Sequence, residues 1–255
     1  MSMQSLSKEE RQQLILNHIS EVGKVDMKSL SQKLSVSTDT IRRDIKEMAD
    51  QGLLKATRGG AIAHSPIPLH FRDREKYDVS GKQQIALKAL SQLKDGQVVL
   101  FDGGTSTLAI AMNLPKELQI TVVTNSFPVA NVLEDHPNVE VIFAGGRLSK
   151  FGFNTSGPET MQAFENTRAD ICFLSIYAIH PTVGITTRQY EDALMKKTMV
   201  KTARRIIGLA TLNKVNTAEA FYICPVTDLD MLLTDATDDH EQLTANLKNM
   251  GIDVR

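Results

Sequence analysis

Two adjacent arginines, Arg42 and Arg43, lie in the stretch SVSTDTIRRDI near the start of the chain. If this stretch is helical, 100° per residue brings Ile41 and Ile45 onto one apolar face and turns the arginines outward. Outward-facing guanidinium groups can hold phosphate oxygens or the edge of a guanine base. The same pattern also fits a solvated helix surface, on which Asp39 and Arg43 form an ordinary i,i+4 ion pair. The arginine pair alone leaves both interpretations open.

The elements that must position these arginines favour a nucleic-acid interface. Helical spacing predicts two helices within residues 7–34, separated by a short connection. A third helix is predicted to begin near Ser37 or Thr38, either of which can cap it, and to end at Gly52. The run LLKATRGGAIA that follows predicts two short strands around a turn at Arg58. Three helices followed by a hairpin are the order of a winged helix-turn-helix domain.

In such a domain the third helix enters the major groove of double-stranded DNA, and the wing reaches a phosphate or the minor groove. The candidates for DNA contact are Ser37, Thr38, Thr40, Arg42, Arg43, Lys46 and Arg58. Residues 1–63 carry ten Lys and Arg against eight Asp and Glu, and the whole chain has a net charge of −1. Because one module with so little excess charge would bind DNA weakly, we expect a homo-oligomer that presents at least two copies.

The bulk composition restricts the remaining classes of function. The 255 residues, 42% hydrophobic and 23% charged, are typical of a globular protein with a sizeable core. No apolar run approaches the roughly 18 residues of a membrane helix, and the N-terminus lacks the apolar core of a signal peptide. Cys172 and Cys224 lie in separate apolar runs, which predicts buried free thiols in a reducing compartment. The histidines and cysteines do not cluster at metal-ligand spacing. We therefore expect a cytoplasmic protein without a membrane segment, metal or cofactor.

The rest of the chain predicts a second domain of a different class. Residues 64–80 contain two prolines and little periodicity, which indicates a stiff connector between a DNA-binding domain over 1–63 and an effector domain over 81–255. From residue 97 onward, apolar runs such as QVVLFD, ITVVTN, ADICFLSIYAI and AFYICPV alternate with helical patterns. This alternation predicts an α/β fold with a mostly parallel sheet covered by helices.

Several predicted strands end in residues that could bind an anion. Ligands of such sheets sit beyond the carboxyl ends of the strands, so the loops there are candidate binding positions. The candidates are Gly103, Gly104, Thr105 and Ser106 after QVVLFD, Thr124 and Asn125 at the end of ITVVTN, Gly145 and Gly146 at the end of the further run VEVIFAGG, and Lys214 after the strand IIGLA. Glycines let the backbone approach a ligand, and hydroxyls beside free helix amides suit a phosphate. Ordinary strand–helix turns are the alternative, because the same residue types are common in any turn.

Taken in order, these motifs resemble a known family. The stretches SVSTDTIRRDI and GLLKATRGGAI resemble the N-terminal signature of DeoR-type bacterial repressors, and FDGGTST, VTNS, FAGGR and GITT are similar to successive landmarks of that family's effector domain. The resemblance implies a repressor of a sugar-catabolic operon. It implies an effector domain with a fold like that of ribose-5-phosphate isomerase and coenzyme A transferases, which senses a phosphorylated sugar or related metabolite. The ligand site it implies consists of Asp102, Gly103, Gly104, Thr105, Ser106, Thr124, Asn125, Gly145, Gly146, Lys196 and Lys214.

Two departures from the family pattern bear on the ligand. Leu194 stands where the family commonly has a glutamate, and Thr211 where it often has an aspartate, so two expected carboxylates are missing. The alternative function is a sugar-phosphate isomerase with a regulatory DNA-binding module, in which Asp102 or Glu191 would be the base. A scaffold with an unused pocket is a third interpretation. We expect a regulator and not an enzyme, with the effector and the operator left open.

Overall fold

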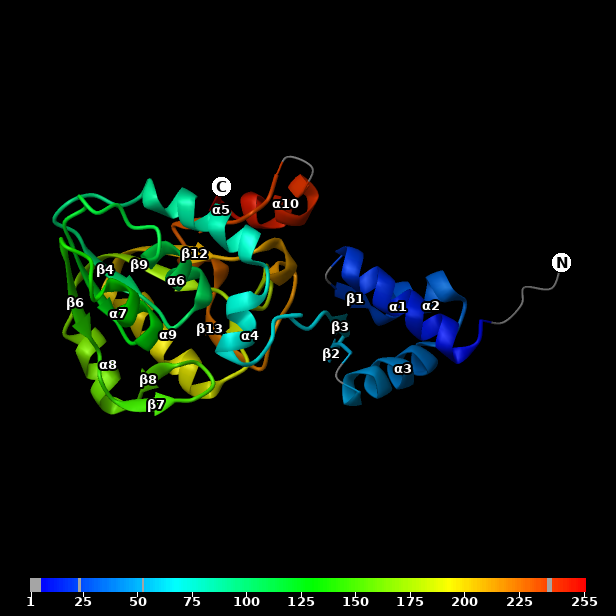
Figure 1. Ribbon diagram of the computed structural model, residues 1–255. Helices are drawn as coiled ribbons and strands as arrows, with labels where there is room; N and C mark the ends of the chain where they lie inside the picture. Colours follow the sequence, from blue (N-terminus) through cyan, green and yellow to red (C-terminus); the bar gives the residue numbers. More distant parts are fainter. Residues whose placement is uncertain (1–5, 23, 52, 238–239) are drawn as a thin grey trace.

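The computed structural model describes residues 6–22, 24–51, 53–237 and 240–255. A small N-terminal lobe and a larger C-terminal lobe are joined by a narrow waist, at which the chain leaves the small lobe (Figure 1). None of the described helices is long and apolar enough to cross a membrane.

The small lobe consists of three helices and a three-stranded antiparallel sheet. Its elements are α1 (Lys8–Val22), β1 (Lys24–Asp26), α2 (Met27–Leu34), α3 (Thr38–Asp50), β2 (Lys55–Ala56) and β3 (Gly60–Ile62), with the strands paired in the order β1-β3-β2. Local hydrogen bonds fix the helix starts. The N–H of Glu10 donates to Ser7 Oγ (3.1 Å) while the N–H of Ser7 donates to Glu10 Oε2 (2.9 Å), which closes a capping box on α1. The N–H of Thr40 donates to Ser37 Oγ (3.1 Å), so α3 begins after Ser37 as predicted.

A separate apolar core holds α3 in place. Its buried members are Ile15, Ile19, Val25, Leu30, Ile41, Ile45, Met48, Leu54 and Ala61. The inward side of α3 is also tied to α1 by an ion pair between Arg11 Nε and Asp44 Oδ2 (2.5 Å), whose side chains are both largely buried. Breaking such a pair leaves a charge uncompensated in a poorly solvated place. The core and the ion pair together hold the opposite face of α3 outward.

Two details of the small lobe differ from the sequence prediction, and a third is not tested. Strand β1 was not predicted, because its three residues are too few to show an alternating pattern. Asp39 pairs with Arg42, one turn away at i,i+3, and not with Arg43. Helix α3 ends at Asp50, and the predicted stop at Gly52 lies outside the described residues.

The connector contains a helix that the sequence did not reveal. Helix α4 spans Phe71–Lys76 and is followed by α5 (Val79–Leu90), which begins within the segment 64–80 that was predicted as the connector. Six residues make fewer than two turns, too short for a recognisable period. The side chain of Phe71 is buried in the core of the large lobe, so this part of the connector packs against the α/β domain.

The large lobe is built on a seven-stranded sheet, all of whose neighbouring strands are parallel. Its strand order is β15-β14-β12-β9-β4-β5-β6. The strands are β4 (Val98–Phe101), β5 (Ile120–Thr124), β6 (Val139–Phe143), β9 (Ala169–Ser175), β12 (Ala203–Leu209), β14 (Met231–Leu233) and β15 (Asp253–Val254). The helices between them are α6 (Thr105–Ala111), α7 (Phe127–Leu133), α8 (Pro158–Glu165), α9 (Tyr190–Thr202) and α10 (Glu241–Asn249). The predicted α/β class with a mostly parallel sheet is confirmed.

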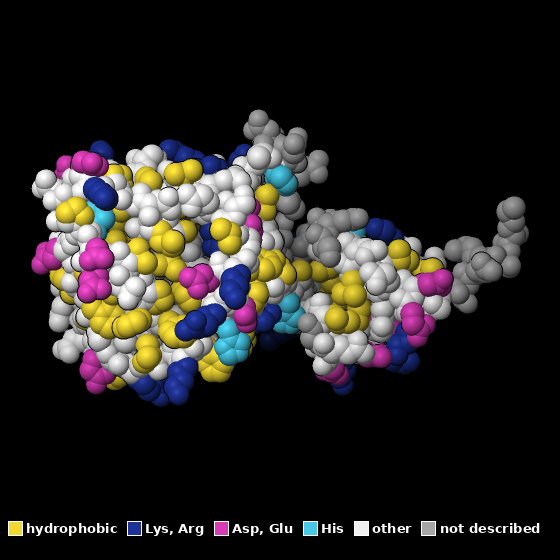
Figure 2. Space-filling view, viewed as in Figure 1, with side chains coloured by type: hydrophobic (Ala, Val, Ile, Leu, Met, Phe, Trp, Pro, Cys, Tyr) yellow, Lys and Arg dark blue, Asp and Glu magenta, His cyan; other side chains and the backbone are white. Residues whose placement is uncertain are grey.

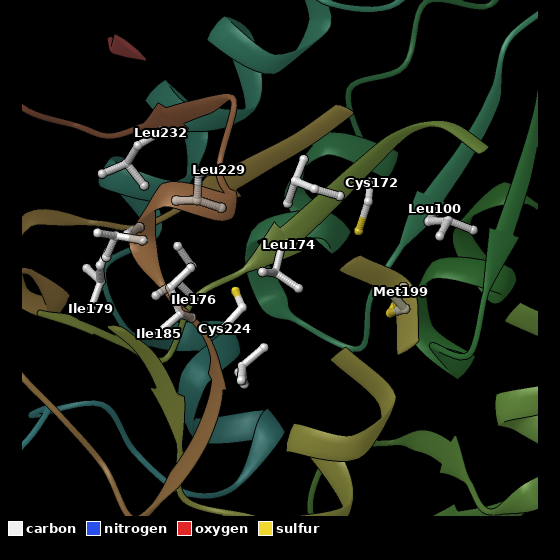
Figure 3. Close-up of a cluster of buried hydrophobic side chains, with 14 of the residues drawn as sticks. Leu100, Cys172, Leu174, Ile176, Ile179, Ile185, Met199, Cys224, Leu229 and Leu232 are labelled. Atoms are coloured by element: carbon white, nitrogen blue, oxygen red, sulfur yellow. The ribbon is translucent and has the colours of Figure 1, made fainter. Parts of the chain in front are cut away.

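The inner strands of this sheet are buried on both faces, which explains why they are continuous apolar runs, whereas the edge strand β6 is largely exposed. Alternate side chains of one strand go to opposite faces. In β9, Phe173 packs with the core under α5, α6 and α7, whereas Cys172 and Leu174 pack with Met199 of α9. Figure 3 shows the second of these cores, with Leu100 of the neighbouring strand β4 beside Cys172. Both cysteines are free and buried, as predicted.

Two smaller antiparallel units flank the main sheet. The hairpin β7 (Arg147–Ser149) and β8 (Asn154–Ser156) forms one, and β10 (Ala178–His180), β11 (Gly184–Thr187) and β13 (Phe221–Cys224) form the other in the order β10-β11-β13. The run AFYICPV was predicted among the strands of the parallel sheet, and this was wrong. An apolar run specifies a buried strand but not its partners, because pairing depends on the rest of the fold.

Candidate functional site

The exposed face of α3 carries most of the residues predicted to contact DNA. Ser37, Thr38, Arg42, Arg43 and Lys46 are exposed there, Thr40 is half-buried, and Arg58 is exposed in the turn between β2 and β3. Among the described residues, no hydrogen bond or ion pair engages the side chain of Arg43 or Lys46, whereas Arg42 pairs with Asp39. Figure 2 shows Lys and Arg side chains beside acidic ones along the lower edge of the small lobe, where Figure 1 places α3. This face therefore offers basic groups that a phosphate or a base edge could engage.

A cavity lies at the carboxyl edge of the parallel sheet. Its wall includes the loop 103–106 after β4, Ser175 at the end of β9 and Lys214 in a short 3₁₀ helix after β12. Helices α4, α5 and α9 contribute Arg74, Lys82 and Lys196, respectively, to the same wall. The cavity holds about 50 Å³, enough for a few waters or the head group of a small ligand. This is the position at which open α/β sheets bind ligands.

Basic side chains outnumber acidic ones around this cavity. The basic ones are Arg74, Lys82, Arg188, Lys196 and Lys214, and the carboxylates in the wall are Asp78 and Asp192. Within the described part of the chain, only Arg188 and Lys196 of these five form ion pairs. Lys82 Nζ donates to the carbonyl oxygens of Arg74 (2.5 Å) and Glu75 (3.2 Å), which carry no charge. The surplus of positive charge in a confined space favours an anionic ligand.

Asp102 organises the loop beneath the cavity. Its buried carboxylate accepts from the N–H groups of Gly104 (3.0 Å) and Ser175 (2.9 Å) and from Thr107 Oγ1 (3.1 Å). It also forms an ion pair with Lys196 Nζ, which donates to the carbonyl oxygen of Ser175 as well. Burial lowers the pKa of Lys196, but the charges of Asp102 and Asp192 outweigh it and hold that pKa above its ordinary value. Lys196 is therefore a permanent cation, already paired inside the protein.

Lys214 has a different character. Its side chain is 7% exposed, and no hydrogen bond or ion pair to its ammonium group is found among the described residues. Burial, and then the positive charges of Lys196, Lys82 and Arg74, lower its pKa from 10.5 to about 7. An anion placed beside this amine would reverse the shift, because an opposite charge favours the protonated form. Lys214 is thus the basic group of the cavity whose protonated form an anionic ligand would stabilise most.

The loop after β4 leaves one further group unsatisfied. Ser106 Oγ is buried and has no hydrogen-bond partner among the described residues. The glycines of this loop are required by packing. A Cβ on Gly103 would come within 2.3 Å of Asn154 Nδ2, and one on Gly104 within 1.9 Å of Ser175 Oγ. The loop therefore lies tight against its neighbours, and Ser106, which lines the cavity, keeps a buried hydroxyl without a partner among the described residues.

Comparison with protein-family models matches the chain in two segments. The DeoR-like helix-turn-helix domain matches residues 11–66, and the DeoR C terminal sensor domain matches residues 78–236. The chain belongs to the DeoR family. It is a DNA-binding transcriptional regulator, as the sequence predicted, and not an enzyme.

Similar proteins of the DeoR family carry the names of regulators. The HTH-type transcriptional regulator GlpR of Haloferax volcanii is 32% identical over 247 residues, which cover 96% of each chain. The Glycerol-3-phosphate regulon repressor of Escherichia coli is 28% identical over 240 residues, which cover 90% of this chain and 95% of that one. Among solved structures, ribose 5-phosphate isomerase A of Methanocaldococcus jannaschii shares 15% identity and a TM-score of 0.39 over 52% of both chains.

The fold of this DeoR-family chain brings together some of the predicted ligand residues and leaves others apart. Gly103, Gly104, Thr105, Ser106, Lys196 and Lys214 line the cavity, with Asp102 directly behind them. Thr124 Oγ1 instead donates to the carbonyl oxygen of Phe101 (2.7 Å), and Asn125 Nδ2 to that of Thr155 (2.7 Å). The exposed Gly145 and Gly146 do not line the cavity. None of these four positions therefore lines the cavity.

Three basic residues of the cavity were missed by the sequence analysis. Arg74 lies in the connector helix α4, Lys82 in α5 and Arg188 just before α9. The only local signal was the charged run RDREK in a segment interpreted as a linker. Of the two departures from the family pattern, Thr211 lines the cavity, whereas Leu194 lies outside it in a neighbouring surface groove.

Proposed function

We propose that this DeoR-family regulator is a repressor of a sugar-catabolic operon, whose DNA affinity is set by a phosphorylated sugar or related phosphate ester bound in the cavity. The observation that carries the proposal is that two polar groups of the cavity wall lack hydrogen-bond partners among the described residues. The amine of Lys214 and the hydroxyl of Ser106 have no partner among the described residues, in a wall of five basic groups and two carboxylates. A phosphate dianion supplies acceptor oxygens and negative charge for both.

In this proposal the phosphate lies against the loop 103–106 and beside Lys214, and Asp102 and Lys196 hold that loop in shape. Thr124, Asn125, Gly145 and Gly146 act from outside the cavity, by supporting neighbouring loops. The carboxylates Asp78 and Asp192 are available for hydroxyl groups of the ligand. The acids absent at positions 194 and 211 are then not needed for an anion to bind.

The proposed DNA contacts follow from the outward face of α3. Ser37, Thr38, Thr40, Arg42, Arg43 and Lys46 face the major groove, and Arg58 in the wing reaches the backbone or the minor groove. We place the DNA-binding domain in residues 1–63, the connector in 64–80 and the effector domain in 81–255. Since a single head carries little excess charge, the functional unit is a homo-oligomer whose heads bind half-sites about one helical turn, or a multiple of it, apart.

The geometry of the two candidate bases argues against the isomerase alternative. Asp102 already accepts hydrogen bonds from Gly104, Ser175, Thr107 and Lys196, so its oxygens are engaged by the protein and are not free beside a substrate. Glu191 pairs with Arg147 and accepts from Ser156 Oγ (3.2 Å), and it does not line the cavity. A ligand bound there has no free carboxylate of either residue beside it.

The decisive experiment selects operator DNA from a random pool and then measures its affinity with a panel of compounds. The panel contains inorganic phosphate, glycerol 3-phosphate, ribose 5-phosphate, glucose 6-phosphate and the unphosphorylated sugars. We expect one phosphate ester to raise the melting temperature and to change the DNA affinity, with no effect of its unphosphorylated counterpart. Failure of every phosphate compound on both readouts would refute the proposal, and chemical conversion of a compound would favour the isomerase.

A further inference from the structure

The wall of the cavity and the connector to the DNA-binding lobe share a single arginine. Arg188 lines the cavity, and its Nε donates to Glu219 Oε1 (3.0 Å). Its Nη2 donates to the carbonyl oxygen of Ser65 (3.0 Å), in the chain segment that has just left the small lobe. The guanidinium group also lies 5.5 Å from the centre of the Tyr177 ring, another residue of the cavity wall. One planar group thus contacts the cavity, a buried acid and the connector at once.

Glu219 extends these contacts into the connector. Its side chain is 4% exposed, and its Oε1 accepts from the N–H of Ser65 (3.2 Å) in addition to Arg188. Its Oε2 lies 3.5 Å from His64 Nδ1. The hydroxyl of Tyr177 donates to the carbonyl oxygen of Ile67, two residues further along the connector. The connector is therefore fastened to the cavity wall over several consecutive residues.

The backbone around Glu219 reaches the wing of the DNA-binding lobe. Lys55 Nζ in β2 donates to the carbonyl oxygen of Glu219 (2.5 Å). Just beyond β3, the carbonyl oxygen of Ala63 accepts from the N–H of Ala218 (3.1 Å), and Ala63 forms a parallel bridge with Thr217. In Figure 1 the two lobes meet at this narrow waist, near β2 and β3. The segment 217–219 is thus the place where the effector domain contacts the wing.

We propose that Arg188 and Glu219 are the positioning residues that couple the cavity to the DNA-binding lobe, and that an anion in the cavity competes with Glu219 for Arg188. This inference rests on the proposed function, because it specifies how the same cavity regulates DNA binding. A buried carboxylate that loses its cation is costly unless its surroundings rearrange. When Arg188 turns toward the anion, the groups that surround Glu219 must rearrange, and these are the connector and the wing. The ligand and the DNA then favour different arrangements of the contacts around Glu219, and such a difference is the requirement for coupling between two sites.

The test measures a coupling factor, defined as the ratio of the DNA dissociation constants with and without a saturating phosphate ester. The compound is the member of the panel above that raises the melting temperature most. We expect a factor of about 5 or more in the unmodified protein, the lower end of typical allosteric coupling. In Glu219→Ala and Arg188→Ala the factor should fall to within about twofold of 1, whatever the separate affinities become. Arg168→Ala is the matched control, because it removes an exposed arginine of the same domain that donates only to nearby backbone carbonyl groups.

Conservative variants separate coupling from a general structural role. Glu219→Gln keeps an oxygen that can accept from Arg188 and Ser65 but removes the charge, so part of the coupling should return. Arg188→Lys keeps the charge but cannot donate to Glu219 and Ser65 in one plane, so it should bind the phosphate ester with little coupling. If Glu219→Ala and Arg188→Lys bind both DNA and the phosphate ester with the full coupling factor, the inference is wrong while the proposed function stands. If the unmodified protein itself shows no coupling with any phosphate ester, the proposed function fails first.

Discussion

Replacing Lys214 with methionine should stabilise the protein at neutral pH while abolishing its response to phosphate esters. The amine is buried among other cations, which lowers its pKa from 10.5 to about 7. At 1.36 kcal/mol per pH unit, this difference corresponds to a cost on the order of 5 kcal/mol when the group is charged in the folded state. Methionine keeps a similar unbranched shape without the charge. Allowing for lost contacts and for water that reaches the cavity, we expect the free energy of unfolding to rise by about 2–4 kcal/mol at pH 7.

The sign of the pH dependence follows from the two pKa values. Because the folded-state pKa is lower than the unfolded one, the unfolded chain binds more protons between pH 7 and 10.5. The cost of Lys214 is therefore absent above pH 10.5, grows as the pH falls, and is complete below pH 7. The stability difference between Lys214→Met and the unmodified protein should accordingly be largest near pH 7 and disappear near pH 10.5.

Thermal melts at pH 7, 8.5 and 10 measure this difference directly. In a chain of this size, about 2–4 °C corresponds to each kcal/mol, so the variant should melt several degrees higher at pH 7. Lys201→Met is the matched control, since Lys201 is exposed on α9, and its melting temperature should not follow this pattern. A phosphate ester at about 100 times its dissociation constant should stabilise the unmodified protein by roughly 2.7 kcal/mol and leave Lys214→Met unchanged. A variant that melts lower than the unmodified protein at every pH would refute the reasoning.

Three further outcomes are expected. Arg43→Ala should weaken operator binding by about 1–3 kcal/mol if the side chain contacts a base. If it contacts a phosphate, the slope of the logarithm of the affinity against the logarithm of the salt concentration should fall by about one. Anisotropy titrations measure both, and unchanged titrations would mean that this face of α3 is only a solvated surface. Gly104→Ala should lower the free energy of unfolding by about 1–3 kcal/mol, because the new Cβ would lie 1.9 Å from Ser175 Oγ. Ser175→Gly in the same chain should restore part of that loss in denaturant titrations, and no restoration would mean that a different contact is responsible. Light scattering on a sizing column should give a mass of at least twice 28.2 kDa, and a monomer that still binds its operator tightly would contradict the oligomer.

Local signals account for the parts of the fold that could be predicted. The bounds of α2 and the start of α3 follow from apolar spacing and from the caps at Asp26 and Ser37, which act within a few residues. The inner strands of the main sheet are buried on both faces and so appear as apolar runs. The elements β1 and α4 were not predicted, because each is shorter than two full periods of its own pattern. The run 221–224 was recognised as a strand but placed in the wrong sheet, since a strand's partner is chosen by distant parts of the chain.

The sequence by itself determined the two domain types, the outward direction of Arg43 on α3 and the loop after β4, because periodicity, capping and glycine placement are local properties. The tertiary structure decided which charges meet. Arg74 and Lys82 lie more than a hundred residues before Lys196 and Lys214, and only the fold brings them together in one cavity, where burial and then the neighbouring cations lower the pKa of Lys214. The pairing of Arg188 with Glu219 could not be predicted from the sequence either, because an ion pair between residues 31 positions apart produces no periodic pattern.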